Sequence, residues 1–343
     1  MKHLATNPLL LTLLALIHYQ GTRLPNRRVD LYRLCVEALA ETWNLARSLS
    51  GRAIDLHLGE RRLDEEFVVR VLAPVAYGMH EHQPTGLIEQ AELEAQVAKQ
   101  FIDGDGTAEP EAKALAQNFV TLVREQMGLL VERGPKVFGF LHLSFQEYLA
   151  ARFLSERTDT FERLRLRLQQ PRWREVVLLT AGCLRGDYAN QFVENILNAH
   201  SEYDDLLHRD LSLAARCIGD EIPVSLSLRQ TIRDRLLTLW KDPPFPRLQT
   251  EIVKTFGYLK NSQIGNDICN CLLNLLRDRN EDPGIRQKAG EALGKIGKED
   301  HEVLSTFLAL LQDSTEEEEV RWRATQALGI AEERKDEVLN ILA

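Results

Sequence analysis

Several stretches of the chain carry residue types that bind phosphate, calcium or zinc, but their spacing does not suit that chemistry. In GEALGKIG (290–297), three residues separate Gly290 from Gly294 where a phosphate-binding loop has four, and Ile296 stands where Ser or Thr would bind magnesium. The loop DGDGTAEPEAKA (103–114) lacks the glycine and glutamate of a calcium loop. HEH (80–82) lacks the i, i+4 histidines of a zinc-protease helix. The sequence contains no Walker A or Walker B motif, and we expect no catalytic and no metal-binding residues.

The stretch FGFLHLSFQEYLAARFL (138–154) changes its periodicity at a histidine. Phe138 and Phe140 alternate as strand residues do, and from Ser144 onward the apolar residues recur at helical spacing. His142 thus lies at a strand-to-helix junction, where two interpretations are open. The ring caps the following helix or fills a satisfied core position, or its N–H donates to an anionic group such as phosphate. The residues by themselves favour the structural interpretation.

A second candidate is the arginine-rich stretch ERLRLRLQQPRWRE (162–175). Its cations could form a patch for nucleic acid or phosphate: Arg163, Arg165, Arg167, Arg172 and Arg174. Glu162 and Glu175 dilute this charge, and the interleaved leucines indicate a helix with one wet side. We interpret the stretch as a solvated charged face.

The composition excludes some classes of function. The 343 residues are 44% hydrophobic and 27% charged, enough for two or three domains with a sizeable core. The formal net charge of −9 argues against nonspecific nucleic-acid binding, because phosphate backbones require a basic surface. Five cysteines form neither a disulfide framework nor a zinc pattern, since the C-x-C pair Cys269 and Cys271 has no matching second pair. A reducing, cytoplasmic location is the simplest interpretation.

The N-terminal stretch NPLLLTLLALIHYQ (7–20) is apolar almost all round, which predicts a helix buried by its neighbours. Pro8 suits the first helical position, where no backbone hydrogen bond is lost. A secretory signal peptide is the alternative, but no small-residue cleavage site follows the apolar run. The run is also too short to span a bilayer, so we expect no membrane association.

Between residues 63 and 140, three helical stretches are followed by two short apolar strands around the turn ERGPK (132–136). Three helices and a β-hairpin are the layout of a winged helix. Such a domain can bind DNA, but here the third helix offers only Arg124, beside Glu125, and the wing adds only Arg133 and Lys136, offset by Glu132. We therefore interpret the domain as a protein-contact or packing module.

The last third of the chain repeats itself. Similar stretches align on Gly219, Gly257, Gly294 and Gly329, at spacings of 38, 37 and 35 residues. Each leads across a short turn to a second apolar helix, the pattern of a HEAT-type α-solenoid. Residues 206–343 are thus predicted to form about four stacked helix pairs, with the last three glycines ending or tightening the first helices. The predicted fold class is mainly α: a helical domain and a winged helix with one β-hairpin, followed by this solenoid.

Three stretches together carry a family resemblance: NPLLLTLLALIHYQGTRLPNRRVDLYRLCVEALAETW (7–43), GLLVERGPKVFGFLHLSFQEYLAARFL (128–154) and WREVVLLTAG (173–182). Over roughly residues 5–185 the chain resembles the post-ATPase half of NACHT-type STAND NTPases, the NLR-like signalling ATPases common in bacteria, especially cyanobacteria. In that family a nucleotide-binding α/β domain precedes these parts. The resemblance implies a first helical domain over 1–55, a winged helix over 56–142, a second helical domain over 143–205 and sensor repeats over 206–343.

The resemblance also implies two nucleotide contacts. A winged-helix histidine of the family reaches the β-phosphate of ADP and holds the closed resting state, and a proline of the first helical domain packs against adenine. The matching residues are His142 and Pro8, so the resemblance reverses the preference at His142 in favour of phosphate. Because the Walker motifs are missing, we expect no ATPase activity from this chain and at most feeble ADP binding. ADP or ATP is implied only together with an upstream ATPase domain.

The chain would thus be the regulatory and sensor half of a signalling switch. Its implied partners are the upstream NACHT domain and a protein or other ligand on the repeats, with oligomerisation on activation. A free-standing HEAT scaffold with no nucleotide link is the alternative from a different class. The sequence leaves open whether the chain is a fragment or a complete gene product.

Overall fold

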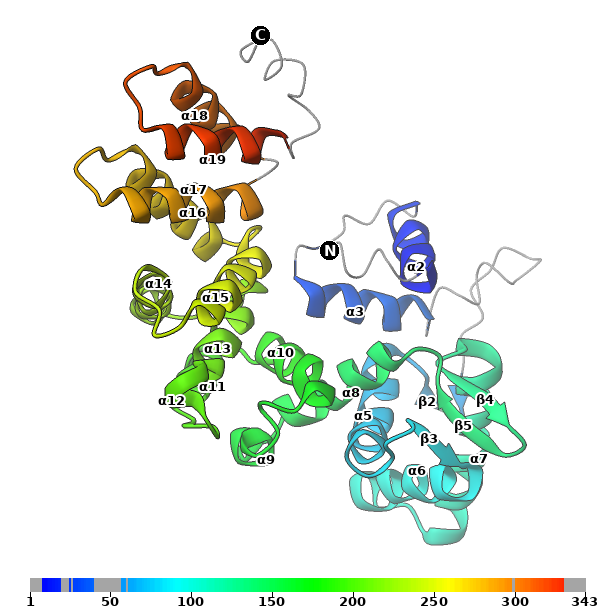
Figure 1. Ribbon diagram of the computed structural model, residues 1–343. Coiled ribbons are helices and arrows are strands. Elements are labelled where there is room, and N and C mark those ends of the chain that lie inside the picture. The colour runs from blue at the N-terminus through cyan, green and yellow to red at the C-terminus, as the bar shows by residue number, and fades with distance from the viewer. Residues whose placement is uncertain are drawn as a thin grey trace. The chain divides into compact units, whose positions relative to one another are not determined.

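The computed structural model describes residues 8–19, 25, 27–39, 57–59, 61–297 and 300–329. The chain divides into two compact units, Met1–Arg185 and Gly186–Ala343. This boundary lies inside the range 143–205 that the resemblance assigns to a second helical domain. Both units are mainly helical, and strands occur, among the described residues, only in the first (Figure 1). This architecture confirms the predicted fold class.

The first unit contains a winged helix between two groups of helices. It starts with α2 (Pro8–Tyr19), α3 (Arg28–Glu37) and a two-stranded ribbon, β1 (His57–Leu58) and β2 (Arg61–Arg62). The winged helix comprises α5 (Glu65–His82), β3 (Leu87–Glu89), α6 (Gln90–Asp105), α7 (Glu109–Leu122), the π-helical turn η2 (Val123–Met127), β4 (Leu130–Gly134) and β5 (Val137–Phe140). The unit ends with α8 (Leu143–Ser155), α9 (Thr160–Arg165), the 3-10 turn η3 (Pro171–Trp173) and α10 (Arg174–Cys183).

The sheet of the winged helix has three antiparallel strands in the order β3-β5-β4, one strand more than the predicted hairpin. β3 pairs Ile88 with Phe138 of the central strand. At three residues, β3 is too short for the alternation that reveals a strand in a sequence. The pairing of β4 with β5 is irregular between Glu132 and Gly134, so Arg133 lies outside the regular ladder.

The winged helix encloses an aromatic core and rests on α8. The Phe67 ring of α5 lies 6.3 Å from that of Phe101 and 6.1 Å from that of Phe119, one residue each from α6 and α7. α5 begins at a true N-cap, because the Asp64 carboxylate accepts the Phe67 N–H at 2.8 Å. α5 and α10 both pack on α8, which is buried along most of its length. The position of α8 therefore fixes the strand-to-helix junction at its start.

α2 is more exposed than its composition predicts. Leu14 is buried, yet Leu11 is 50% exposed and Tyr19 is 89% exposed. The expectation of a helix buried by its neighbours is therefore wrong for the described residues. Its main contact there is with α3, and one neighbouring helix covers only one side of an all-round apolar helix. With 12 residues α2 is too short to cross a bilayer, and no other described helix is long and apolar enough.

The second unit is a stack of antiparallel helices, coloured from green to red in Figure 1. First helices of successive repeats pack on one another, and each second helix contacts the first helix of the next repeat. Three helix pairs are complete, and the predicted fourth is described only in its first helix. The elements are α11 (Asp187–Leu197), α12 (Asp204–Leu207), α13 (Arg209–Gly219), α14 (Leu226–Lys241), α15 (Pro246–Leu259), α16 (Gln263–Arg277), α17 (Pro283–Ile296), α18 (His301–Gln312) and α19 (Glu318–Gly329).

Two of the repeat glycines do not end their helices as predicted. α15 continues beyond Gly257 to Leu259 and α17 beyond Gly294 to Ile296, and neither glycine has the positive φ of a C-terminal cap. Gly294 instead permits close packing, because a Cβ there would lie 2.9 Å from the Cβ of Ala327 in the next first helix. The repeat glycine is thus partly a packing residue.

Gly265→Ala is expected to destabilise the second unit, because the new Cβ would lie 1.9 Å from the backbone carbonyl oxygen of Leu259. Overpacking of this kind costs about 1–3 kcal/mol or more. Gly257→Ala is the matched control in the preceding helix, where a Cβ meets no atom within 4 Å. Helix propensity predicts that this control gains up to about 1 kcal/mol. Urea denaturation measures both variants, and equal midpoints would contradict the packing described here.

Candidate functional site at the winged-helix junction

His142 is the N-cap residue of α8, directly after the last strand of the winged helix. Its backbone is extended, with φ −142° and ψ 145°, as an N-cap requires. The ring nitrogen Nδ1 accepts the backbone N–H of Ser144 at 3.1 Å and lies 2.8 Å from Ser144 Oγ. His142 therefore has the capping role, which is the first of its two interpretations.

The cap also decides where the His142 ring carries its proton. A backbone N–H can only donate, so Nδ1 must be the acceptor, and the neutral ring is protonated at Nε2. Burial lowers the pKa of His142, which favours this neutral form. The ring keeps one N–H donor that the cap does not use. Capping and donation to an anionic group are therefore compatible.

The first turns of α8 contact a residue of α3. Tyr32 is 4% exposed. The Tyr32 ring stacks on Tyr148 with 5.7 Å between centroids and meets Phe145 edge-on at 6.4 Å. These contacts join α3 to the first turns of α8 and hold the cap of His142 in place.

Arg133 reaches the same junction from the wing. Its Nη2 donates to the carbonyl oxygen of Leu141 at 3.0 Å and to that of Phe140 at 3.4 Å. The guanidinium thus lies on the peptide group that immediately precedes His142. From the sequence, Arg133 is only one cation of the wing, because its position depends on the pairing of β4 with β5. The irregular pairing at Glu132 and Gly134 is a feature that no sequence pattern reveals.

Pro8, the other predicted nucleotide contact, is the first residue of α2, the helical position for which proline is suited. Its side chain lies outside the described part of the structure. Its contact with adenine therefore stays a prediction.

Glu147, one turn into α8, is a buried carboxyl group that the sequence does not distinguish from a solvent-exposed helical glutamate. The residue is 9% exposed. Burial raises the pKa of Glu147 to about 8, the nearby Glu175 adds to the rise, and Arg28 opposes it. Arg28 forms an ion pair with Glu175. Glu147 is therefore largely protonated at neutral pH.

The arginine-rich stretch is less solvated than expected, because several of its cations hold the first unit together. Arg167 pairs with Glu81 and lies over the Trp173 ring at 4.6 Å, and Arg172 donates to backbone carbonyls at the end of α5. His80 of the HEH stretch is fully buried, with Nε2 3.2 Å from the Arg172 carbonyl, and burial lowers its pKa to about 4. The described residues contain no cluster of potential metal ligands.

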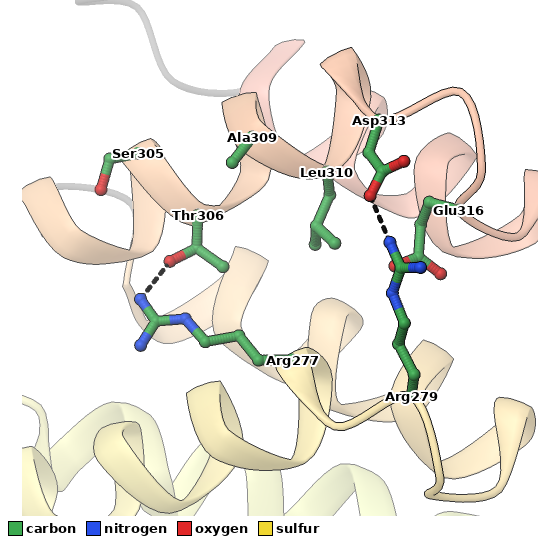
Figure 2. A pocket seen from close by; sticks show the side chains of 8 residues that line it. All are labelled: Arg277, Arg279, Ser305, Thr306, Ala309, Leu310, Asp313 and Glu316. Carbon is green, nitrogen blue, oxygen red and sulfur yellow. Dashed lines mark hydrogen bonds and ion pairs between the residues drawn. The ribbon is translucent and has the colours of Figure 1, made fainter.

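The repeats carry a hollow of about 410 Å³ between the end of α16 and α18 (Figure 2). Arg277 donates to Thr306 Oγ1 at 2.6 Å, and Arg279 pairs with Asp313, so two half-exposed guanidinium groups stand beside the hollow. Leu310 lies between them (Figure 2). Mixed charge around a small apolar centre suits contact with a protein surface.

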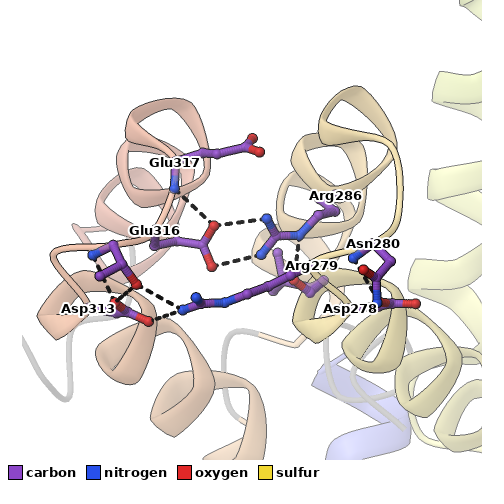
Figure 3. A network of polar contacts seen from close by, with 9 residues as sticks. Asp278, Arg279, Asn280, Arg286, Asp313, Glu316 and Glu317 are labelled. Atoms are coloured by element: carbon purple, nitrogen blue, oxygen red, sulfur yellow. Dashed lines mark hydrogen bonds and ion pairs between the residues drawn. The ribbon is translucent and has the colours of Figure 1, made fainter.

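Next to this hollow, a buried ion pair joins two repeats. Arg286 of α17 donates through both terminal nitrogens to the Glu316 carboxylate, at 2.8 and 2.7 Å, and its Nε donates to the Leu276 carbonyl at 3.1 Å (Figure 3). The two charged side chains are 2% and 3% exposed. Arg279 adds a second tie, at the surface, to Asp313 (Figure 3). Together they fix the turn before α19 against the preceding repeat.

The described residues thus form a winged helix in the first unit and a stack of helical repeats in the second. Residues 28–154 match the family of winged helix-turn-helix domains C-terminal to NACHT, and residues 233–329 match HEAT repeats. These two matches confirm the resemblance to a post-NACHT half with HEAT-like repeats. No curated protein and no solved structure matches the chain. Neither of the matched domain types is catalytic.

Glu147→Gln is expected to raise the free energy of unfolding near pH 8 and to flatten its pH dependence. Between the ordinary carboxyl pKa of 4.5 and the folded value of about 8, the folded state keeps a proton that the unfolded state has lost. Stability therefore falls as the pH rises through this window, by up to about 1.4 kcal/mol per pH unit. Thermal denaturation across this pH range checks the effect, with the exposed Glu162→Gln as control. Parallel curves for wild type and Glu147→Gln would contradict it.

Arg286→Met is expected to destabilise the second unit by about 3–5 kcal/mol, because the Glu316 carboxylate would be left buried without its partner. Adding Glu316→Leu removes both charges and should recover most of the loss. Lys295→Met is the matched control, since its ion pair with Glu291 is 53% and 45% exposed and contributes at most about 1 kcal/mol. Urea denaturation compares the variants. A loss for Arg286→Met no greater than that of the control would refute this prediction.

Proposed function

We propose that this chain is the regulatory and sensor half of a NACHT-type STAND ATPase switch. In the resting state the winged helix closes over ADP held by an upstream nucleotide-binding domain, and His142 donates its Nε2–H to a phosphate oxygen. A ligand on the repeats opens this state and allows the protein to oligomerise. The chain supplies the closing contact and the sensor, and the ATPase chemistry belongs to the upstream domain.

The observation that carries this proposal is the state of His142 within a segment that matches the post-NACHT winged helix. Nδ1 is occupied by the Ser144 N–H, so the ring is fixed in one tautomer with its remaining donor on Nε2. A hydrogen bond to a charged group is worth about 1.5–3 kcal/mol, and each 1.4 kcal/mol changes a population about tenfold. One such contact is enough to bias a closed-to-open equilibrium.

The exposed side of α2 supports an upstream domain. Leu11 and Tyr19 are 50% and 89% exposed, so these two large side chains are available to a partner. The proposed occupant is the nucleotide-binding α/β domain that precedes this helix in the resembling proteins. Pro8, at the start of α2, would then contact adenine, as the resemblance implies.

The proposed sensor is the solenoid of the second unit. HEAT repeats are generally protein-interaction modules, and the hollow beside Arg277 and Arg279 offers charge and a small apolar centre for a protein partner or other ligand. The buried ion pair of Arg286 with Glu316 joins two of these repeats. We place the switch in the cytoplasm, where its free cysteines stay reduced.

The decisive variant is His142→Asn in the protein that carries the upstream NACHT domain. Asn is a preferred N-cap residue, so its side-chain oxygen can replace Nδ1 as the acceptor of the Ser144 N–H, whereas its amide nitrogen lies near the position of the ring Cδ2 and does not extend to that of Nε2. We expect an unchanged melting temperature and a shift toward open, oligomeric protein in ADP, measured by size exclusion with light scattering. His142→Ala loses donor and cap together, so it should also lose about 0.5–2 kcal/mol of stability.

Asp64→Ala is the control for the cap alone, because it removes the N-cap of α5 without touching the junction. It should lower stability as His142→Ala does and leave the protein closed. If His142→Asn stays monomeric in ADP, the proposed phosphate contact is wrong. The sequence upstream of Met1 separates this function from a free-standing scaffold, since only the switch requires an in-frame Walker A motif there.

A further inference from the structure

We propose that Arg133 and His142 form one anion-binding pair, in which the guanidinium of the wing and the imidazole N–H of the junction hold the same phosphate group. This inference rests on the proposed role of His142 and adds a second ligand-binding residue, from strand β4. The chemical class of ligand is a diphosphate, such as the end of a nucleoside diphosphate.

The first support is position. Arg133 Nη2 donates at 3.0 Å to the carbonyl oxygen of Leu141, the peptide group that links directly to His142. A second contact, 3.4 Å to the Phe140 carbonyl, fixes the end of the side chain against β5. The irregular pairing of β4 at this residue directs Arg133 away from the regular ladder and toward the junction. The backbone thus holds the cation at the peptide group next to His142.

The second support is the unused capacity of the guanidinium. Its two contacts use a single nitrogen, and within the described residues no carboxylate pairs with Arg133. The neighbouring Glu132 has other partners: its carboxylate accepts the Lys136 N–H at 3.0 Å and lies 3.8 Å from Arg124 Nη1. Arg124 also pairs with Glu125. Arg133 is therefore the wing arginine whose charge is left for a ligand, whereas Arg124 is already neutralised.

Phosphate suits this pair of donors. A guanidinium presents several N–H groups in one plane, and a phosphate group has enough oxygen atoms to accept from it and from an imidazole at once. Neither donor carries a negative charge, so no metal ion is needed between the two side chains and the anion.

The test uses the full chain and inorganic pyrophosphate as the probe, without magnesium, against sodium chloride at equal ionic strength. NMR follows the Cε1–H resonance of His142, which detects weak binding. In wild type we expect a saturable shift with pyrophosphate and none with sodium chloride. Arg133→Gln should weaken the affinity at least about tenfold, the effect of losing one charge-assisted contact. Arg124→Gln removes the same charge from the same domain and should change it little.

Arg133→Lys is the second variant, because it keeps the charge but not the planar donor set, and it should fall between wild type and Arg133→Gln. Equal affinities for wild type and Arg133→Gln would overturn the inference, as would the absence of any His142 response in wild type. Unfolding of both Arg133 variants would show a purely structural residue and overturn it too. The proposed function is decided separately, by His142→Asn in the longer protein.

Discussion

The hydrogen bond from the Ser144 N–H to His142 Nδ1 determines both the local fold and the chemistry of the junction. As a helix cap it satisfies an N–H that α8 cannot pair within itself, and so it sets where the helix begins. As an acceptor it takes the one lone pair of Nδ1, which places the ring proton on Nε2. A capping Asp would do the first as well but has no donor of its own. Under the proposed function, a histidine adds the Nε2–H donor to the capping role.

A displacement of this cap would affect all of α8, because its packed neighbours restrict the movement of that helix. It packs on α5 and α10, and Tyr32 of α3 stacks on its Tyr148 ring. Close-packed interiors do not deform gradually, so a helix enclosed in this way moves with its neighbours or not at all. A ligand that engages His142 therefore acts on the whole winged helix rather than on one flexible loop.

The sequence predicts the elements of this fold well, since long helices carry a strong period and the repeats recur at nearly constant spacing. It predicts His142 as a candidate because the period changes there. What it does not predict depends on neighbours distant in the chain. β3 is too short to show alternation, Arg133 reaches the junction through an irregular strand pair, and Glu147 is buried by helices that only the folded unit brings together. Gly257 and Gly294 resemble helix ends in sequence, yet their helices continue. Close packing against the next repeat explains the glycine at position 294 but not at 257, where a Cβ would meet no atom within 4 Å.

An anion site in a chain with a net charge of −9 needs its acidic neighbours to be neutralised, and at this junction they are. The Glu132 carboxylate accepts the backbone N–H of Lys136 and forms an ion pair with Arg124. Glu175 is paired with Arg28. Glu147, on the same helix as the cap, is held largely protonated by its burial. A carboxylate left free within a few ångströms would cancel the attraction of one guanidinium, since unit charges at such distances interact by several kcal/mol in a partly buried setting. Among the described residues, Glu132 and Glu175 are thus paired and Glu147 is largely protonated. The proposed anion would therefore meet the Arg133 guanidinium and the His142 N–H without repulsion from these three acids, although the whole chain is acidic.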